Sequence, residues 1–405
     1  MTLLFSAGSG GVYMANIFDY LEWRGDIRQD QIPFNTVDYL ILSRISYLPF
    51  DGIVPDDSGT ESITIGEAAE LFAKLRSGKN NPIDPHIIWH DDIPFIAALG
   101  KSPRFSGLKL TRYVNIVDTA QEKQFSALTI LGCDNFLFVS FRGTDNTIVG
   151  WKEDFNMSFL SNIPAQKEAV EYLNGTARAF SENMKLGGHS KGGNLAIYAA
   201  SFCGEDVRSR ITDIYTQDSP GFCEDVLSAA GYLEISGRIH AFVPQGSVVG
   251  MLFGHTGNYT VVKSTEKGIL QHDIYSWEVI RDDMVRLETV TKGSTFMDKT
   301  MNEWITGLTP DQRRQFSDTI YTMLTATDSQ TLQELTSSRL KNAIAMVRAL
   351  RIAGKSDRAA VGGAVTAFLK AARDNMKTLF PEREKKKHKP SVQAEADRAE
   401  GPLRA

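Results

Sequence analysis

A run of glycines between a strand-like and a helix-like segment constrains the fold of this chain more than any other feature. Residues 184–186 have strand character, four glycines follow within residues 187–193, and residues 195–202 have an apolar, helix-forming pattern. Only residues as small as glycine allow a backbone to turn so sharply from a strand into a helix. The run therefore predicts a tight strand–turn–helix unit at the centre of the fold.

The segments around this unit predict an α/β protein. Short gaps separate the first strand-like runs, which favours antiparallel hairpins; these runs cover residues 109–116, 125–131 and 136–141. After residue 165, helices alternate with strands, which indicates a parallel sheet covered on both faces; its strands are residues 184–186, 211–216, 239–243 and 259–263. We expect a mostly parallel sheet flanked by helices, with a helical C-terminal extension.

The pattern divides the chain into four regions. In chain order they are a candidate N-terminal extension (1–13), the main α/β domain (14–280, with 14–105 as a candidate helical cap), a helical C-terminal region (281–380) and a charged, disordered tail (381–405). Within the helical region, a capping box begins a helix at Thr309 and a second helix covers residues 332–352. Glycines at 354, 362 and 363 are expected to interrupt the helical pattern that follows.

Composition excludes several classes of protein. The chain has 44 basic against 49 acidic residues, a formal net charge of −5, which argues against a general nucleic-acid binder. No stretch approaches the roughly 20 apolar residues of a membrane-spanning helix, and the N-terminus makes a poor signal peptide. Three widely spaced cysteines, Cys133, Cys203 and Cys223, suggest buried thiols in a reducing compartment. We expect a soluble, cytoplasmic protein, whose oligomeric state the sequence leaves open.

Within the glycine run, Gly188-x-Ser190-x-Gly192 is the spacing of a nucleophilic serine on a strand-to-helix turn. Such a turn exposes the serine hydroxyl at the positive end of the following helix, and it positions the N–H of Lys191 to stabilise an oxyanion. A phosphate-binding loop does not fit, because Lys191 precedes the final glycine. An ordinary glycine-rich loop is the structural alternative.

These residues carry a resemblance to a known superfamily. Residues 188–193 resemble the nucleophile turn of the α/β-hydrolases, and residues 138–144 resemble the strand of class 3 (fungal-type) lipases that ends at the oxyanion residue. Trp151 and Asp154 follow as in those lipases. The wider pattern is closest to an uncharacterised bacterial lipase-like family, through segments 16–20, 217–222 and 271–273. The resemblance implies a serine hydrolase, with Thr144 beside Lys191 at the oxyanion position; a plain strand end with an Arg142 salt bridge is the alternative.

The serine needs a base, and seven histidines compete. His272 is the best candidate because it follows the last strand in the order serine, acid, histidine, and because it matches the family's Gln-His-Asp segment. His255 is second. His189 is expected to be structural and His240 to lie in the core, while His388 lies in the tail. His86 and His90 stand beside Asp91 and Asp92 like a metal cluster, but nearby prolines disfavour a regular helix there.

The acid is the least settled member. Class 3 lipases place an Asp after the strand that corresponds to residues 239–243, and Ser247 stands there in this chain. Asp218 directly follows strand 211–216, where strand ends face the ligand crevice of an α/β sheet. Asp273 adjoins His272 and cannot easily reach its neighbour's ring. We predict Asp218 as the acid; a serine-assisted dyad or a different carboxylate remains open.

The predicted function is hydrolysis of a small or lipid ester through an acyl-enzyme on Ser190, with no metal or organic cofactor. The same residues also suit an amidase or peptidase. A third possibility is an inactive hydrolase-fold protein that uses its helical C-terminal region for interaction. Residues 248–254 and the first hundred residues are candidate covers of the site.

Overall fold

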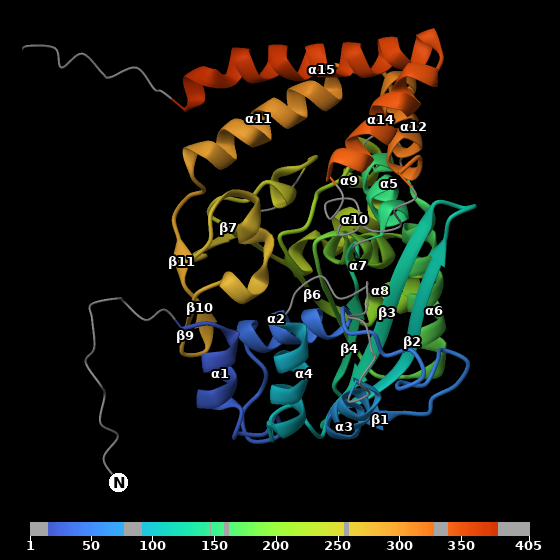
Figure 1. The fold of residues 1–405 in the computed structure, drawn as a ribbon. Coiled ribbons are helices and arrows are strands. Elements are labelled where there is room, and N and C mark those ends of the chain that lie inside the picture. The colour runs from blue at the N-terminus through green and yellow to red at the C-terminus, as the bar shows by residue number, and fades with distance from the viewer. Residues whose placement is uncertain are drawn as a thin grey trace, which may run out of the picture.

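The computed structural model describes residues 15–76, 91–145, 147–157, 162–254, 259–327 and 339–379. The protein is a mixed α/β structure, in which helices pack on both faces of a large central sheet (Figure 1). The predicted N-terminal extension and charged tail lie outside the described residues. None of the described helices is long and apolar enough to cross a membrane.

The central sheet has nine strands among the described residues, in the order β1-β2-β3-β4-β5-β6-β7-β8-β11. Its strands are β1 (Ile63–Thr64), β2 (Lys109–Asp118), β3 (Lys123–Leu131), β4 (Leu137–Phe141), β5 (Met184–His189), β6 (Ile211–Gln217), β7 (Ile239–Pro244), β8 (Tyr259–Val262) and β11 (Arg286–Leu287). A separate antiparallel pair joins β9 (Val279–Ile280) to β10 (Asp283–Met284).

The strand pairing confirms the predicted antiparallel set and the predicted parallel set of strands, but the sheet as a whole is not mostly parallel. Strands β2, β3 and β4 pair antiparallel, as their short connections predict, and β4 to β8 run parallel. The sheet is mixed, not mostly parallel, because antiparallel strands extend it at both edges: β1 pairs with β2, and β11 pairs with β8.

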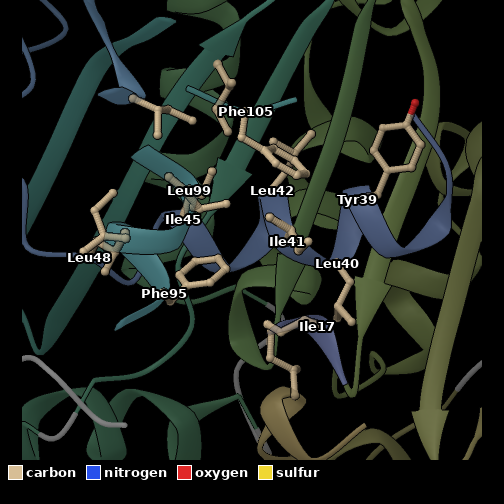
Figure 2. Close-up of a cluster of buried hydrophobic side chains, with 14 of the residues drawn as sticks. Ile17, Tyr39, Leu40, Ile41, Leu42, Ile45, Leu48, Phe95, Leu99 and Phe105 are labelled. Carbon is tan, nitrogen blue, oxygen red and sulfur yellow. The ribbon is translucent and has the colours of Figure 1, made fainter. Parts of the chain in front are cut away.

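One face of the sheet is covered by the first helices, with α2 against β4, β5 and β6. These helices are α1 (Ile17–Arg24), α2 (Thr36–Ile45), α3 (Ile65–Arg76) and α4 (Asp92–Lys101). Figure 2 shows the apolar cluster between them, where Leu40, Ile41 and Ile45 are completely buried. The α2 helix thus lies against the sheet as part of this layer. A buried bidentate ion pair, Arg44 with Asp92, joins α2 to α4.

The opposite face is covered by the helices that connect the parallel strands. They are α6 (Pro164–Ala179), α7 (Lys191–Phe202), α8 (Glu205–Ser209), α9 (Glu224–Leu227) and α10 (Ala230–Ile235). Side chains alternate between the two apolar clusters along β4: Phe138 faces the first layer, while Val139 and Phe141 face the second. The sheet is therefore buried on both sides, as parallel strands require.

The C-terminal helices form a third group, seen in orange and red at the top of Figure 1. They are α11 (Lys292–Thr306), α12 (Pro310–Thr325), α14 (Arg339–Ile352) and α15 (Lys355–Asn375). The capping box at Thr309 is confirmed. The expected interruption at Gly362 and Gly363 is wrong, because α15 continues through both and packs on α11 and α12 with Ala364 buried. Of these three glycines, only Gly354 lies at a helix boundary, as the N-cap of α15.

Two predictions of burial are also wrong. Cys133 and Cys223 are exposed, and only Cys203 is buried, where burial raises the pKa of its thiol to about 11. His240 is not a core residue: it is the second residue of β7 and is exposed, and its ring nitrogen lies 3.0 Å from the Asp213 carboxylate. The remaining described elements are α5 (Ile148–Asn156) and short 3₁₀ turns, two of which, η2 (Val249–Met251) and η3 (Gly268–His272), border the site.

Candidate active site

Ser190 lies at the turn between β5 and α7, in a conformation that L-residues rarely adopt. Its φ and ψ are 58° and −135°, and its backbone N–H donates to the Gln217 carbonyl at 2.9 Å. A strained backbone of this kind persists only where the surrounding structure holds it. The predicted strand–turn–helix unit is thus present, and it leaves the Ser190 side chain half-exposed at the end of the sheet.

Two glycines let other segments approach this turn closely. A Cβ atom on Gly192 would lie 2.1 Å from the Phe141 carbonyl oxygen, so α7 can start directly against the end of β4 only with glycine there. A Cβ on Gly143 would lie 2.7 Å from the His189 carbonyl oxygen and 3.0 Å from the Ser190 Cβ. These close contacts bring the segment after β4, including Thr144, next to Ser190.

Asp218 and His272 are in direct contact, although they are far apart in the chain. The His272 Nδ1 lies 2.6 Å from the Asp218 Oδ2. Asp218 follows β6 with a positive φ of 46° and is buried, whereas His272 ends the 3₁₀ turn η3 and is partly exposed. A carboxylate only accepts hydrogen bonds, so this contact fixes the proton of a neutral His272 ring on Nδ1 and leaves Nε2 as an acceptor.

The other oxygen of Asp218 is held by the segment after β7. The Ser247 hydroxyl lies 2.5 Å from Asp218 Oδ1, and the Gly250 backbone N–H donates to the same oxygen at 3.0 Å. Ser247 is the residue found where class 3 lipases carry their acid. In this protein its hydroxyl holds the carboxylate of Asp218, which follows the neighbouring strand β6.

Thr144 and Asp154 form a second polar contact at the site. The Thr144 hydroxyl donates to the Asp154 carboxylate, with both oxygens at 2.7 Å. Burial raises the pKa of Asp154 to about 6, against the opposing effects of the Lys191 charge and the Thr144 hydroxyl. Because its hydroxyl is committed to Asp154, Thr144 has its backbone N–H as the donor available to a ligand.

Behind the serine turn, the Lys191 side chain is buried in a polar network. Its Nζ lies 2.9 Å from Glu153 Oε2 and 2.9 Å from Gln124 Oε1, and it is 3.9 Å from Asp154 Oδ1. Glu153 also accepts the backbone N–H of Ala165 at 2.9 Å. The network ties α7 to β3, α5 and α6. The Lys191 backbone N–H is the first of α7, a position without a partner inside the helix.

His189 is buried and holds the backbone of His272. Its Nε2 donates to the His272 carbonyl at 2.7 Å, and the Tyr47 hydroxyl lies 3.1 Å from its Nδ1. The two imidazole rings are tilted toward each other, with their centroids 4.4 Å apart. Burial, with the charges of His272 and Arg44, holds the pKa of His189 well below its usual range, so its ring is neutral.

A cavity of about 430 Å³ connects four of the predicted site residues. They are Ser190, His272, Thr144 and Lys191, while Asp218 lies behind His272. Among the described hydrogen bonds, none joins the Ser190 hydroxyl to the His272 ring, but both residues line the same cavity. Most of the rest of the cavity is apolar and comes from α5, η2, η3, α11 and α12.

The alternative candidates for the base, the acid and a metal site are either not described or have other partners. His255, His86, His90 and His388 lie outside the described residues. Asp273 accepts the backbone N–H of Tyr275 at 3.0 Å instead of contacting the His272 ring, and burial raises the pKa of Asp273 to about 6. Within the described ranges, no group of three or more His, Cys, Asp or Glu side chains is arranged to hold a metal.

Sequence reasoning missed the contact of Ser247 with Asp218 and that of His189 with His272. Strand order could have shown the first, because the ends of the adjacent strands β6 and β7 meet at one edge. The second had no sequence signal: His189 and His272 are brought together only by the path of the chain after β8.

Comparison with solved structures finds several lipases at low similarity. The chain is similar to the native lipase propeptide complex of Rhizomucor miehei at 16% identity, over 57% of this chain and 68% of that one, with a TM-score of 0.35. M37 lipase has 15% identity, coverage of 54% and 70%, and a TM-score of 0.33. A mutant form of MDLA from Penicillium cyclopium has 15% identity, coverage of 53% and 81%, and a TM-score of 0.32.

The search of curated proteins gave no match. A family model described as Mbeg1-like matches residues 99–322, which is more than half of the chain. The matched segment runs from the end of α4 to α12, and it includes Ser190, Asp218, His272 and both predicted oxyanion residues. This chain therefore belongs to the Mbeg1-like family.

Proposed function

We propose that this protein is a lipase-like serine hydrolase, which cleaves a carboxylic ester through an acyl-enzyme on Ser190. The observation that carries the proposal is the 2.6 Å contact between Asp218 and His272 beside a serine on a strained strand-to-helix turn. The α/β-hydrolase resemblance of residues 138–144 and 188–193 supports the same conclusion. An interaction protein has no need of a buried carboxylate aimed at a partly exposed histidine in the serine's own cavity.

In the proposed mechanism, His272 Nε2 takes the proton of the Ser190 hydroxyl while Asp218 stabilises the resulting imidazolium. The Ser190 oxygen attacks the ester carbonyl carbon, and the backbone N–H groups of Lys191 and Thr144 hold the oxyanion. His272 returns its proton to the departing alkoxide, leaving an acyl-Ser190. A water molecule, deprotonated by His272, then attacks the acyl carbonyl, and the carboxylic acid is released as Ser190 regains its proton.

The absence of a hydrogen bond between the Ser190 hydroxyl and the His272 ring among the described residues is compatible with this mechanism. Catalytic hydrogen bonds are often long without substrate and tighten only when the reacting groups are in place. The oxyanion donors are better prepared: the Lys191 N–H begins α7, and Thr144 is held by Asp154 with its hydroxyl turned away. We infer that the two backbone N–H groups, and not the Thr144 hydroxyl, carry oxyanion stabilisation.

An apolar cavity favours an ester with a hydrocarbon acyl group over a peptide. A peptide backbone brings N–H and C=O groups that each cost free energy when they are buried without partners. Among the residues lining the cavity, the charged ones are Asp145, Asp154, Lys191 and Arg313. Lys191 adjoins Ser190 in the chain and lies 3.9 Å from Asp154, whereas Arg313 belongs to α12. Most of the wall therefore offers no polar partner for an amide.

Labelling with a fluorophosphonate probe tests the proposal. We expect the wild type to be labelled, Ser190→Ala to be unlabelled, and Ser201→Ala to be labelled normally, because Ser201 is buried in the same helix and donates to the Ile197 carbonyl. If folded wild type is not labelled, even with a detergent that exposes apolar sites, the proposal fails. The inactive interaction protein then becomes the better account of the fold.

A further inference from the structure

The cavity beside Ser190 has two ends of different chemistry. One end holds the polar residues of the strand ends, with Ser190 and His272 among them, and the other is formed largely by the C-terminal helices α11 and α12. The apolar end is lined by Met301, Trp304, Ile305, Leu308 and Phe316. These side chains continue the wall away from the nucleophile.

The apolar residues of α11 form one face of that helix. Met301, Trp304 and Ile305 follow the spacing i, i+3, i+4, which places them on a single stripe, and Leu308 comes two residues after the end of the helix. That stripe faces the cavity. On the other side of the cavity, α5 contributes Trp151 and Phe155. The Phe155 ring packs edge-on against the Phe316 ring, with 6.3 Å between the ring centroids.

Trp304 is fixed more firmly than its neighbours. Its indole Nε1 donates to the Ala364 carbonyl of α15 at 2.8 Å. Its ring contacts Phe316 and Phe368 edge-on, with centroid distances of 5.6 Å in both cases. A large ring held by a hydrogen bond and two aromatic contacts is suited to act as a rigid wall, because it has little freedom to move aside.

The C-terminal helices are also joined to the loops that carry the polar end. The Ser294 hydroxyl, at the start of α11, donates to the Ser247 carbonyl at 2.6 Å, and Ser247 supports Asp218. At α12, Ser317 donates to the Asn156 side-chain oxygen at 3.2 Å, and Asp318 pairs with the buried Lys152 of α5. The apolar wall is thus anchored on both sides of the site.

From these contacts we infer that α11 and α12 form the binding wall for a linear acyl chain, and that Trp304 limits the length of chain accepted. The inference rests on the proposed function, because it places the ester carbonyl at Ser190. A methylene group is comparable in size to a water molecule, whose share of liquid volume is about 30 Å³, so the cavity holds on the order of ten methylenes. A medium-length chain fills it; a longer one meets Trp304.

Chain-length profiles of kcat/KM test the wall. With p-nitrophenyl butyrate, octanoate, dodecanoate and palmitate, we expect the wild type to favour octanoate or dodecanoate, with a gain of about fourfold per buried methylene up to that length. Trp304→Ala is expected to raise the ratio of kcat/KM for palmitate to kcat/KM for octanoate at least about tenfold, because removal of the indole ring opens space for a longer chain. Ile305→Trp is expected to shift the optimum toward butyrate. Trp23→Ala, which removes an exposed tryptophan of α1 away from the cavity, is the matched control.

A binding measurement separates this inference from the proposed catalysis. Ser190→Ala, with and without Trp304→Ala, is titrated with dodecanoate and with palmitate against a fluorescent fatty acid. Tighter palmitate binding only in the Trp304→Ala background supports the wall, even if no probe labels Ser190. If the wild type is labelled but both Trp304→Ala and Ile305→Trp fold and keep the wild-type profile, the inference is wrong while the proposed function stands.

Discussion

The two ends of the cavity are built from different kinds of structure. The polar groups stand at the ends of strands, where Ser190 and Asp218 both have positive φ angles and are surrounded by the sheet. The apolar end stands on two amphipathic helices that are partly open to solvent and attached by a few hydrogen bonds. The difference fits the two proposed roles, because proton transfer depends on direction, whereas burial of a hydrocarbon does not.

The two ends should tolerate substitution differently. A carboxylate that is displaced by about 1 Å loses its hydrogen bond, so the polar end needs several contacts for each group. Asp218 accordingly has three, to His272, Ser247 and Gly250. An apolar wall needs only shape, so substitutions there should alter selectivity while leaving the chemistry intact.

The largest expected effect comes from a substitution of Asp218, the proposed acid at the polar end of the cavity. Asp218→Asn should lower kcat by about 10⁴-fold, because an amide that donates to the His272 ring favours the wrong tautomer. Initial rates with p-nitrophenyl octanoate measure the loss. Asp213→Asn is the matched control, since Asp213 lies on β6, the strand that Asp218 follows, but pairs with Lys185 and His240 and does not line the cavity. A loss below about tenfold would show that another group orients His272.

The next effect concerns stability at the polar end. Lys191→Met leaves Glu153 buried without its cation and should lower the free energy of unfolding by about 3–5 kcal/mol. Replacing both partners, as in Lys191→Met with Glu153→Gln, should recover much of that loss. Urea unfolding measures both variants.

An exposed ion pair provides the comparison for that experiment. Arg286→Ala removes the partner of Asp283 at the surface, where such pairs contribute about 0–1 kcal/mol. If Lys191→Met lowers the free energy of unfolding no more than Arg286→Ala does, the buried network does not stabilise the serine turn. The buried ion pair would then contribute no more to stability than an exposed one.

Local patterns predicted the part of the fold that depends on local rules. The glycines of residues 187–193 predicted the turn at Ser190. The structure gives the reason, because a Cβ atom on Gly192 or Gly193 would lie too close to the carbonyl oxygen of Phe141 or of Gly188. Short gaps predicted the antiparallel strands β2 to β4, and the alternation of elements predicted the parallel strands β5 to β8. The position of Asp218 directly after strand β6 predicts it as the acid; its contact with His272 is present, and its catalytic role stays a prediction.

The rest depends on contacts between distant segments, for which a single sequence carries no local signal. The stripe of α11 predicts a helix with an apolar face, but not that this face lines the cavity beside Ser190. Gly362 and Gly363 suggested a break in α15, yet the cost of glycine in a helix, about 1 kcal/mol each, is small against the packing of α15 on α11 and α12. Tertiary contacts override a weak local preference.

The smallest effect concerns Asp154, which connects the two ends through α5, and it depends on pH. The pKa of Asp154 is about 6 in the folded protein, above the ordinary value of 3.8, so the folded state holds this proton more tightly than the unfolded state does. Its contribution to stability is therefore fully present below about pH 4 and is lost as pH rises toward and through about 6. Between these limits the loss is on the order of 2 kcal/mol.

Asp154→Asn isolates this contribution, because asparagine has no proton to release and keeps an oxygen that accepts from Thr144. The free energy of unfolding of the wild type minus that of the variant should fall by on the order of 2 kcal/mol between about pH 4 and about pH 7. Urea unfolding at both pH values, with Asp273→Asn as a second variant because burial also raises the pKa of Asp273 to about 6, separates the two carboxyls. A pH-independent difference for Asp154→Asn would mean that the pKa of Asp154 is the same in the folded and the unfolded protein, so that Lys191 and the Thr144 hydroxyl fully offset the effect of burial.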